Sequence, residues 1–234
     1  MPKIGIVGGG PCGTYLAYAL SRAGHDVYLY EREDDIGGCW GVYPDSQTKL
    51  FTEHAPRVMF DNYVNTKEFF SDIGIDFDDN FKKMYNVFAK MLRSLHIFTL
   101  WDLTALTIAY MYPSIAWNSH TMKSVCDTYG LSDRAKEYIN QSCYAMDGVS
   151  YDKLSAMEYF ETLDTVLLST MYESKKASTE YLIPKLKSAL KDVHIQTQHT
   201  LVRYLPDTNT ALFSTIDGMK KVTHDKLIVC IPPA

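Results

Sequence analysis

The sequence predicts an α/β fold, and three observations near the N-terminus carry that prediction. The apolar run Lys3–Val7 is typical of a parallel strand that is buried on both faces. A run of glycines follows it, and then a helical pattern with apolar residues on one side. A second apolar run, Val27–Tyr30, ends directly before the acidic residue Glu31. This order of strand, glycine turn, helix, strand and acid predicts a Rossmann-like dinucleotide-binding unit.

The glycine run predicts how a dinucleotide would bind. The segment Gly8-Gly9-Gly10-Pro11-Cys12-Gly13 fits the pattern G-x-G-x-x-G, with Gly8, Gly10 and Gly13 in its glycine places. The first glycine permits a tight turn, the second lets the backbone approach a pyrophosphate, and the third allows close packing of helix on sheet. Pro11 and Cys12 then begin the helix, whose N-terminal N–H groups attract phosphate.

Glu31 stands where an acid at the end of the second strand accepts hydrogen bonds from a ribose diol. A carboxylate in this place repels the 2′-phosphate of NADP. The sequence therefore favours FAD or NAD as the dinucleotide.

The residues after Glu31 distinguish FAD from NAD as the expected cofactor. Asp35-Ile36-Gly37-Gly38-Cys39-Trp40 resembles the segment that extends the fingerprint in FAD-dependent oxidoreductases of the glutathione-reductase-like superfamily. The sequence of this segment is close to that of flavin-containing monooxygenases. The order of motifs along the whole chain is more similar to that of the amine oxidase and phytoene desaturase group. The resemblance implies FAD as cofactor and contacts to it from Arg32, Gly37, Gly38, Cys39 and Trp40.

Two positions depart from the amine oxidase pattern. Glu33 and Cys39 stand where these enzymes usually carry arginines. The pyrophosphate charge would then be met by Arg32, by Arg57, or by backbone N–H groups alone.

Thr52–Val58 resembles the stretch that passes near the flavin ring in desaturase-like oxidases. Glu53, His54 and Arg57 lie either beside the cofactor or in a solvated loop, and no catalytic residue is assigned. The five cysteines, Cys12, Cys39, Cys126, Cys143 and Cys230, lack CxxC spacing, so neither a metal site nor a disulfide framework is expected.

The middle of the chain, residues 66–177, shows helical periodicity and predicts an inserted helical substrate or cap domain. One expected helix begins near Asp133, with Ser132 or Asp133 as its N-cap. Another helical stripe is formed by Met84, Tyr85, Phe88, Met91, Leu92 and Leu95. Its aromatic and methionine content suits an apolar substrate.

The last part returns to an α-then-β pattern, so residues 1–65 and 178–234 are expected to form the dinucleotide-binding domain in two segments. A helix over 178–191 precedes strands at 193–197 and 200–205 and a meander that ends at 226–231. This order is similar to that of the amine oxidases. The similarity implies that the backbone of Leu201 or Val202 contacts the adenine.

The net charge of −5 argues against nucleic acid as a partner. Ile97–Trp117 is mostly apolar, and its Thr, Ser and Pro content favours a buried or cofactor-facing helix over a membrane span, with membrane association as the alternative. The cysteine usage predicts a reducing compartment, and the N-terminus shows no secretory signal, so a cytoplasmic location is expected.

The resemblance implies an FAD-dependent oxidoreductase that transfers hydride from a small organic molecule to the flavin. It covers only the N-terminal half of a typical family member, so a C-terminal half or a partner chain is expected. Two alternatives stay open. One is a non-catalytic binding or structural protein that retains the flavoprotein scaffold, and the other is a stand-alone NAD-binding protein.

Overall fold

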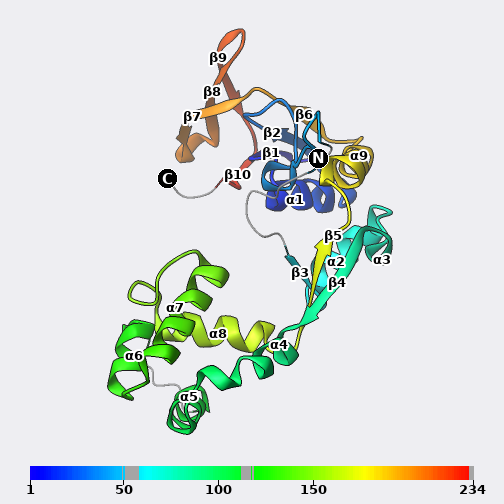
Figure 1. Cartoon of the computed structure of the whole chain (residues 1–234). Coiled ribbons are helices and arrows are strands. Elements are labelled where there is room, and N and C mark those ends of the chain that lie inside the picture. The colour runs from blue at the N-terminus through cyan, green and yellow to red at the C-terminus, as the bar shows by residue number, and fades with distance from the viewer. Residues whose placement is uncertain (49, 51–57, 112–116, 118, 232–234) are drawn as a thin grey trace. The chain divides into compact units, whose positions relative to one another are not determined.

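The computed structural model describes residues 1–48, 50, 58–111, 117 and 119–231. The chain divides into two compact units, whose elements are labelled in Figure 1. The sheet unit comprises Met1–Val58, Tyr63–Lys82 and Glu173–Ala234. The helical unit comprises Met59–Asn62 and Lys83–Tyr172.

A parallel sheet forms the centre of the sheet unit. Its order is β10-β1-β2-β6, with β1 at Lys3–Val7, β2 at Asp26–Tyr30, β6 at His194–Gln196 and β10 at Lys226–Val229. Ile4–Val7 of β1 are buried, as expected of a central parallel strand with both faces covered. The predicted α/β fold is confirmed.

Helices of the sheet unit pack through aromatic side chains. Helix α1 (Pro11–Arg22) contacts β1 and β2 and buries Tyr18. The ring of Phe69 on α2 (Val64–Asp72) lies 5.1 Å from the Tyr15 ring and 5.4 Å from the Tyr18 ring. Helices α3 (Phe77–Asn80) and α9 (Ser178–Ala189) complete this set.

An antiparallel meander covers the ends of β1 and β2. It comprises β7 (Thr200–Leu205), β8 (Thr210–Thr215) and β9 (Gly218–Thr223), in the order β7-β8-β9. Phe213 of β8 stacks on Tyr30 of β2 at a centroid distance of 4.5 Å, and both are buried with Val7 and Ala211. The predicted strand at 200–205 is confirmed as β7. The expectation that the meander ends at 226–231 is wrong, because that strand is β10 and pairs in parallel with β1.

A second three-stranded sheet has the order β3-β5-β4, with β3 at Val58–Phe60, β5 at Thr170–Ser174 and β4 at Phe81–Asn86. The helical periodicity expected at Met84 and Tyr85 is wrong, because both residues lie in β4. Asn86 is the N-cap of α4 (Val87–Arg93), and its side chain accepts a hydrogen bond from the Ala89 N–H at 3.1 Å. The helix therefore begins only after this cap.

Helices α5 (Leu100–Met111), α6 (Met122–Thr128), α7 (Asp133–Asp147) and α8 (Ala156–Val166) share one buried apolar core in the helical unit. Ser132 caps α7 as predicted, since its hydroxyl accepts from the Ala135 N–H at 3.3 Å. Short 3₁₀ turns lie in connections between these elements, among them η1 (Gly38–Trp40), η2 (Leu95–Ile97) and η4 (Pro206–Thr208).

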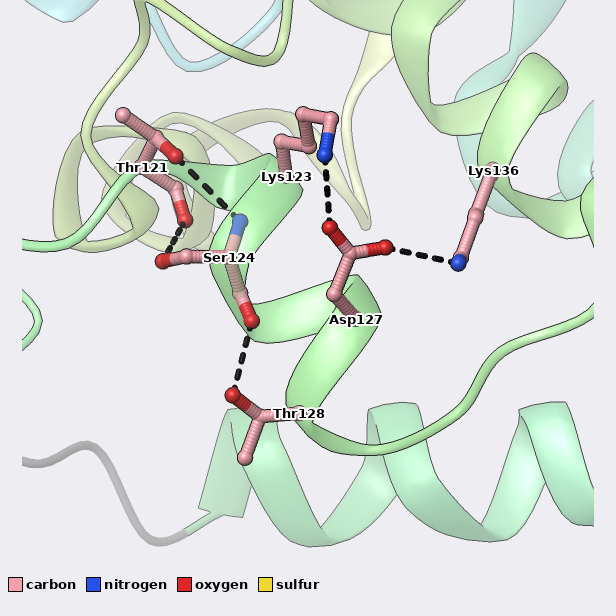
Figure 2. Close-up of polar contacts among 6 residues, drawn as sticks. All are labelled: Thr121, Lys123, Ser124, Asp127, Thr128 and Lys136. Carbon is pink, nitrogen blue, oxygen red and sulfur yellow. Dashed lines mark hydrogen bonds and ion pairs between the residues drawn. The ribbon is translucent and has the colours of Figure 1, made fainter.

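Asp127 ties α6 to α7 at the surface of the helical unit. Figure 2 shows its carboxylate between two lysines, with Lys123 Nζ at 2.6 Å and Lys136 Nζ at 2.7 Å. Hydrogen bonds from Lys123 and Lys136 lower the pKa of Asp127 to about 2. Thr121, in the same view, caps α6 by accepting from the Ser124 N–H at 3.2 Å.

Asp102 is a buried carboxylate at the start of α5. It accepts hydrogen bonds from the N–H and hydroxyl of Thr99, both at 2.8 Å, and from the N–H and hydroxyl of Ser132, both at 2.7 Å. Burial acts to raise the pKa of Asp102, but these hydrogen bonds outweigh it and lower the pKa to about 2. The carboxylate thus joins the N-terminus of α5 to that of α7.

The outer side of α5 exposes apolar residues along one stripe. Leu100 is 82% exposed, Trp101 57%, Ile108 43% and Met111 62%. Within the part of the chain that the structure describes, no helix has the length and apolar character that a membrane crossing requires.

Candidate dinucleotide-binding site

The turn between β1 and α1 is built around two glycines that admit no side chain. Gly8 has φ +106°, and its N–H donates to Tyr30 O at 2.8 Å. A Cβ on Gly8 would lie 2.6 Å from Cys230 O, and a Cβ on Gly13 would lie 1.8 Å from Gly8 O. Gly8 therefore permits the turn and Gly13 permits the close approach of α1, as the motif predicts.

Gly10 differs from these two glycines because space is open beside it. It is the N-cap residue of α1 with φ −75°, and a Cβ there would meet nothing nearer than Gly38 Cα at 4.0 Å. No side-chain hydrogen bond caps α1, and Pro11 occupies its first turn. The first N–H groups of α1 therefore lack a side-chain cap, and the helix dipole favours negative charge at this end of the helix.

Glu31 holds the turn in place. Its carboxylate is buried, with 6% exposure for the residue, and accepts hydrogen bonds from the Gly9 N–H at 2.6 Å and the Glu33 N–H at 2.9 Å. A carboxylate offers about four lone-pair sites, so acceptor capacity for a ribose diol is left. The sequence motif contains no signal for this second, structural role of Glu31.

The second glycine pair lies against the first turn. Gly37 and Gly38 have φ of +119° and +51°, and the Gly37 N–H donates to Gly9 O at 2.7 Å. A Cβ on Gly38 would lie 2.8 Å from Gly10 Cα. The two glycine segments are therefore neighbours, and both lie at the α1 N-terminus.

The other residues that were predicted to contact the cofactor near this turn differ in their surroundings. Arg32 is largely exposed and pairs with Glu33 at 2.9 Å, so its charge is engaged by the neighbouring acid. Cys12 and Cys39 are exposed. Trp40 packs against Phe70 with centroids 5.7 Å apart. Arg57, with Glu53 and His54, lies outside the described residues, and its predicted role stays a prediction.

Leu201 and Val202 lie on β7, at the edge of the meander. Leu201 pairs with Phe213, and the register then shifts before Arg203. Val202 has no partner in β8 within this described ladder and is 56% exposed. The adenine contact expected of Leu201 or Val202 stays a prediction.

A buried histidine, His224, packs against β1 of the parallel sheet and was not predicted from the sequence. His224 Nε2 lies 2.9 Å from the Tyr30 hydroxyl, and a Cβ on Gly5 would approach the His224 ring to 2.3 Å. Burial and the charge of Lys3 lower the pKa of His224. Burial raises the pKa of Tyr30 to about 12. Both groups are therefore neutral near pH 7. Their contact lies at the end of β2, directly before Glu31.

Residues 6–73 match the family described as NAD(P)-binding Rossmann-like domain. The chain contains a Rossmann-like domain. This domain includes the glycine-rich turn, Glu31 and the Gly37-Gly38 pair, and the predicted Rossmann-like fold is confirmed.

Two curated relatives are named as an oxidoreductase and an oxidase. FAD-dependent oxidoreductase dbaF of Emericella nidulans is 38% identical over 74 residues, which is 32% of this chain and 16% of that protein. L-amino-acid oxidase of Bungarus fasciatus is 26% identical over 159 residues, which is 66% of this chain and 29% of that protein. The matches thus span less than a third of these relatives' own length.

Solved structures share the fold beyond the Rossmann-like domain. An oxidoreductase from Methanosarcina mazei has a TM-score of 0.68 at 15% identity and covers 97% of this chain and 58% of that one. Wild-type putrescine oxidase bound to putrescine has a TM-score of 0.66 at 16% identity and covers 99% and 58%. The predicted resemblance to amine oxidase-like flavoproteins is confirmed, and this chain spans somewhat more than half of their length.

Proposed function

We propose that the Rossmann-like domain binds FAD, with the pyrophosphate at the N-terminus of α1 and the ribose diol at Glu31. The observation that carries this proposal is the open space at Gly10, framed by Gly38 and by the uncapped first turn of α1. A phosphate there would be met by backbone N–H groups and by the positive end of the helix dipole. Backbone donors suffice for this contact, so the pairing of Arg32 with Glu33 does not oppose it.

The remaining predicted residues extend this site along the cofactor. Gly37 and Gly38, with the adjoining Cys39 and Trp40, would lie beside the diphosphate. Leu201 or Val202 of β7 would meet the adenine through backbone groups. Val202 lies where the register of β7 against β8 shifts. Arg57 would add a cation. The relatives named FAD-dependent oxidoreductase and L-amino-acid oxidase support FAD over NAD.

We infer that the activity is oxidation of a small organic molecule by hydride transfer to the cofactor. Bound FAD would supply the hydride acceptor, and the chain would supply binding, orientation and exclusion of water. Residues 66–177 would form the substrate or cap domain, and their aromatic content suits an apolar substrate. Since the chain covers 58% of the putrescine oxidase structure, a further segment or a partner chain would complete the substrate site.

The absorbance spectrum of the purified chain tests this proposal, before and after titration with FAD. The expected result is flavin bands at about 375 and 450 nm that co-elute with the protein, with about one FAD released per chain on heating. NAD titrated in parallel should bind more weakly. A chain that retains neither dinucleotide would contradict the proposal.

A substitution at Gly10 tests whether FAD binds at the proposed site. Gly10→Ala places a methyl group in the cradle but meets no protein atom nearer than 4.0 Å, so the fold should be kept. Loss of FAD retention in this variant, with an unchanged circular dichroism spectrum, is expected. Unchanged FAD retention would contradict the placement of the phosphate beside Gly10.

A further inference from the structure

The exposed face of α5 carries no charged side chain. Helical spacing places the exposed residues of this helix on one side, and they are Leu100, Trp101, Thr104, Thr107, Ile108 and Met111. The one formally charged residue of α5, Asp102, lies on the opposite side and is buried. A helix that meets water carries charged and polar residues on its outer side, so the composition of this face is that of a covered surface.

The polar groups of this face already have partners within the protein. The hydroxyls of Thr104 and Thr107 each donate to the carbonyl oxygen four residues earlier, at 2.9 Å and 2.7 Å. Trp101 is 57% exposed, yet its indole N–H donates to Tyr129 O at 2.9 Å. Because these donors are paired, the face can leave water without losing hydrogen bonds.

The length of α5 fits a helix that lies on a membrane surface. Its 12 residues rise about 18 Å, whereas the hydrocarbon core of a bilayer is about 30 Å thick. The exposed face runs along the whole helix, from Leu100 to Met111. A short helix with one apolar face and a Trp suits the boundary between headgroups and acyl chains.

The charges that precede α5 are positive, although the chain as a whole has a net charge of −5. Between residues 83 and 111 the basic residues are Lys83, Lys90 and Arg93, all exposed, and the acid is the buried Asp102. Lys90 and Arg93 lie in the last turn of α4, which η2 connects to α5 (Figure 1). Cations beside an exposed apolar face favour an anionic surface as the partner.

We propose that the exposed face of α5 docks on an anionic phospholipid surface. The apolar side chains of the face enter the boundary between headgroups and acyl chains, and Lys90 and Arg93 meet the headgroup phosphates. A second copy of this chain fits the face less well, because a two-fold pairing through it brings the same cations of both chains near one another. The docking needs no dinucleotide and is independent of the proposed function.

Vesicle flotation of the purified chain tests the proposal. The chain should float with vesicles of equal parts phosphatidylcholine and phosphatidylserine, and much less with vesicles of phosphatidylcholine alone. Added salt should weaken the binding, because it screens the attraction between the cations and the headgroups. The mixed vesicles should also shift the tryptophan emission to shorter wavelength, and Trp101→Phe should abolish this shift. A chain that floats with neither kind of vesicle would overturn the proposal.

Substitutions assign the binding to α5 and to the cations that precede it. Leu100→Glu places a charge on the face at a residue that is 82% exposed, so the circular dichroism spectrum should be unchanged and vesicle binding at least tenfold weaker. Ile216→Glu is the matched control, since Ile216 is also 82% exposed but lies between β8 and β9. Lys90→Gln and Arg93→Gln should each weaken binding to the mixed vesicles about fivefold. Equal binding by Leu100→Glu and the wild type would overturn the proposal.

Analytical ultracentrifugation without vesicles distinguishes docking on lipid from pairing of two chains. A dimer that Leu100→Glu disperses, in a chain that binds neither kind of vesicle, would assign the face to a second copy and overturn the lipid proposal. FAD titration of Leu100→Glu should give the wild-type affinity. Failure of the wild type to bind FAD would contradict the proposed function and leave the vesicle result readable.

Discussion

The carboxylate of Glu31 accepts a 2.6 Å hydrogen bond from the Gly9 N–H, across the turn that joins β1 to α1. The acid expected to hold the ribose therefore also holds the phosphate turn. If FAD binds as proposed, this one side chain would couple binding of the ribose to binding of the phosphates. Substitution of this residue should consequently affect the fold as well as the affinity for the cofactor.

We expect Glu31→Gln to lower the free energy of unfolding by about 1–3 kcal/mol. A carboxamide can accept from only one of the two N–H groups with its oxygen, and its NH₂ then faces the other donor. Urea unfolding followed by circular dichroism measures this change. Glu33→Gln is the control, since the Glu33 side chain is exposed and pairs with the neighbouring Arg32. If the variant is as stable as the wild type but binds FAD more weakly, the Glu31 carboxylate acts in ligand binding and does not stabilise the fold.

Gly10→Ala and Gly13→Ala should separate binding from folding. A methyl group at Gly13 would lie 1.8 Å from Gly8 O, whereas at Gly10 it makes only ordinary contact. We expect Gly13→Ala to shift α1 and destabilise the sheet unit by several kcal/mol, and Gly10→Ala to leave stability within about 1 kcal/mol of the wild type. Thermal unfolding and FAD titration of both variants check this. Similar stability losses in the two variants would contradict it.

Asp102 should contribute stability that depends on pH. Its folded pKa of about 2 lies below its ordinary value, so the stabilisation is complete above about pH 4 and is lost as the pH falls toward 2. We expect Asp102→Asn to lower the free energy of unfolding by about 2 kcal/mol near pH 7, and the difference from wild type to shrink in acid. Urea unfolding across this pH range measures it.

Asp127→Asn is the matched control for that series. Asp127 also has a pKa of about 2, but its side chain is 44% exposed, so solvent and salt screen its lysine pairs. Its substitution should change stability little, and added salt should reduce the change further. A larger loss for Asp127→Asn than for Asp102→Asn would contradict the distinction.

The cysteines should fall into two reactivity classes. Burial raises the pKa of Cys126 and of Cys143 to about 12, whereas Cys12 and Cys39 are exposed. We expect a thiol reagent such as DTNB to modify Cys12 and Cys39 rapidly in the native chain, and Cys126 and Cys143 only after unfolding in urea. Mass spectrometry of the modified peptides identifies the classes. Rapid modification of Cys143 would indicate local opening of the helical unit.

The sequence was most informative where chemistry restricts the residue type. Gly8 and Gly13 tolerate no Cβ, so their spacing between a strand and a helix identified the turn. The N-cap at Ser132 was also predictable, because a capping hydroxyl acts within its own few residues. These features depend on local geometry that the sequence encodes directly.

Features that depend on tertiary pairing were not predictable in this way. Met84 and Tyr85 fit a helical stripe, yet they form β4, because ladder hydrogen bonds with β5 override local periodicity. The second role of Glu31 requires the turn to bring Gly9 against it. Likewise, the hydrogen bond from the Cys230 N–H to Val7 O arises only because β10 pairs with β1, from opposite ends of the chain.

The apolar stripe on α5 bears on how the purified chain behaves. Leu100 and Trp101 are more than half exposed, and Met111 extends the stripe. Apolar surface of this kind promotes concentration-dependent self-association, which light scattering would register as a rising apparent mass. Spectroscopic and crystallisation work on the isolated chain therefore calls for dilute samples, with Trp101 emission as the indicator that the stripe has become covered.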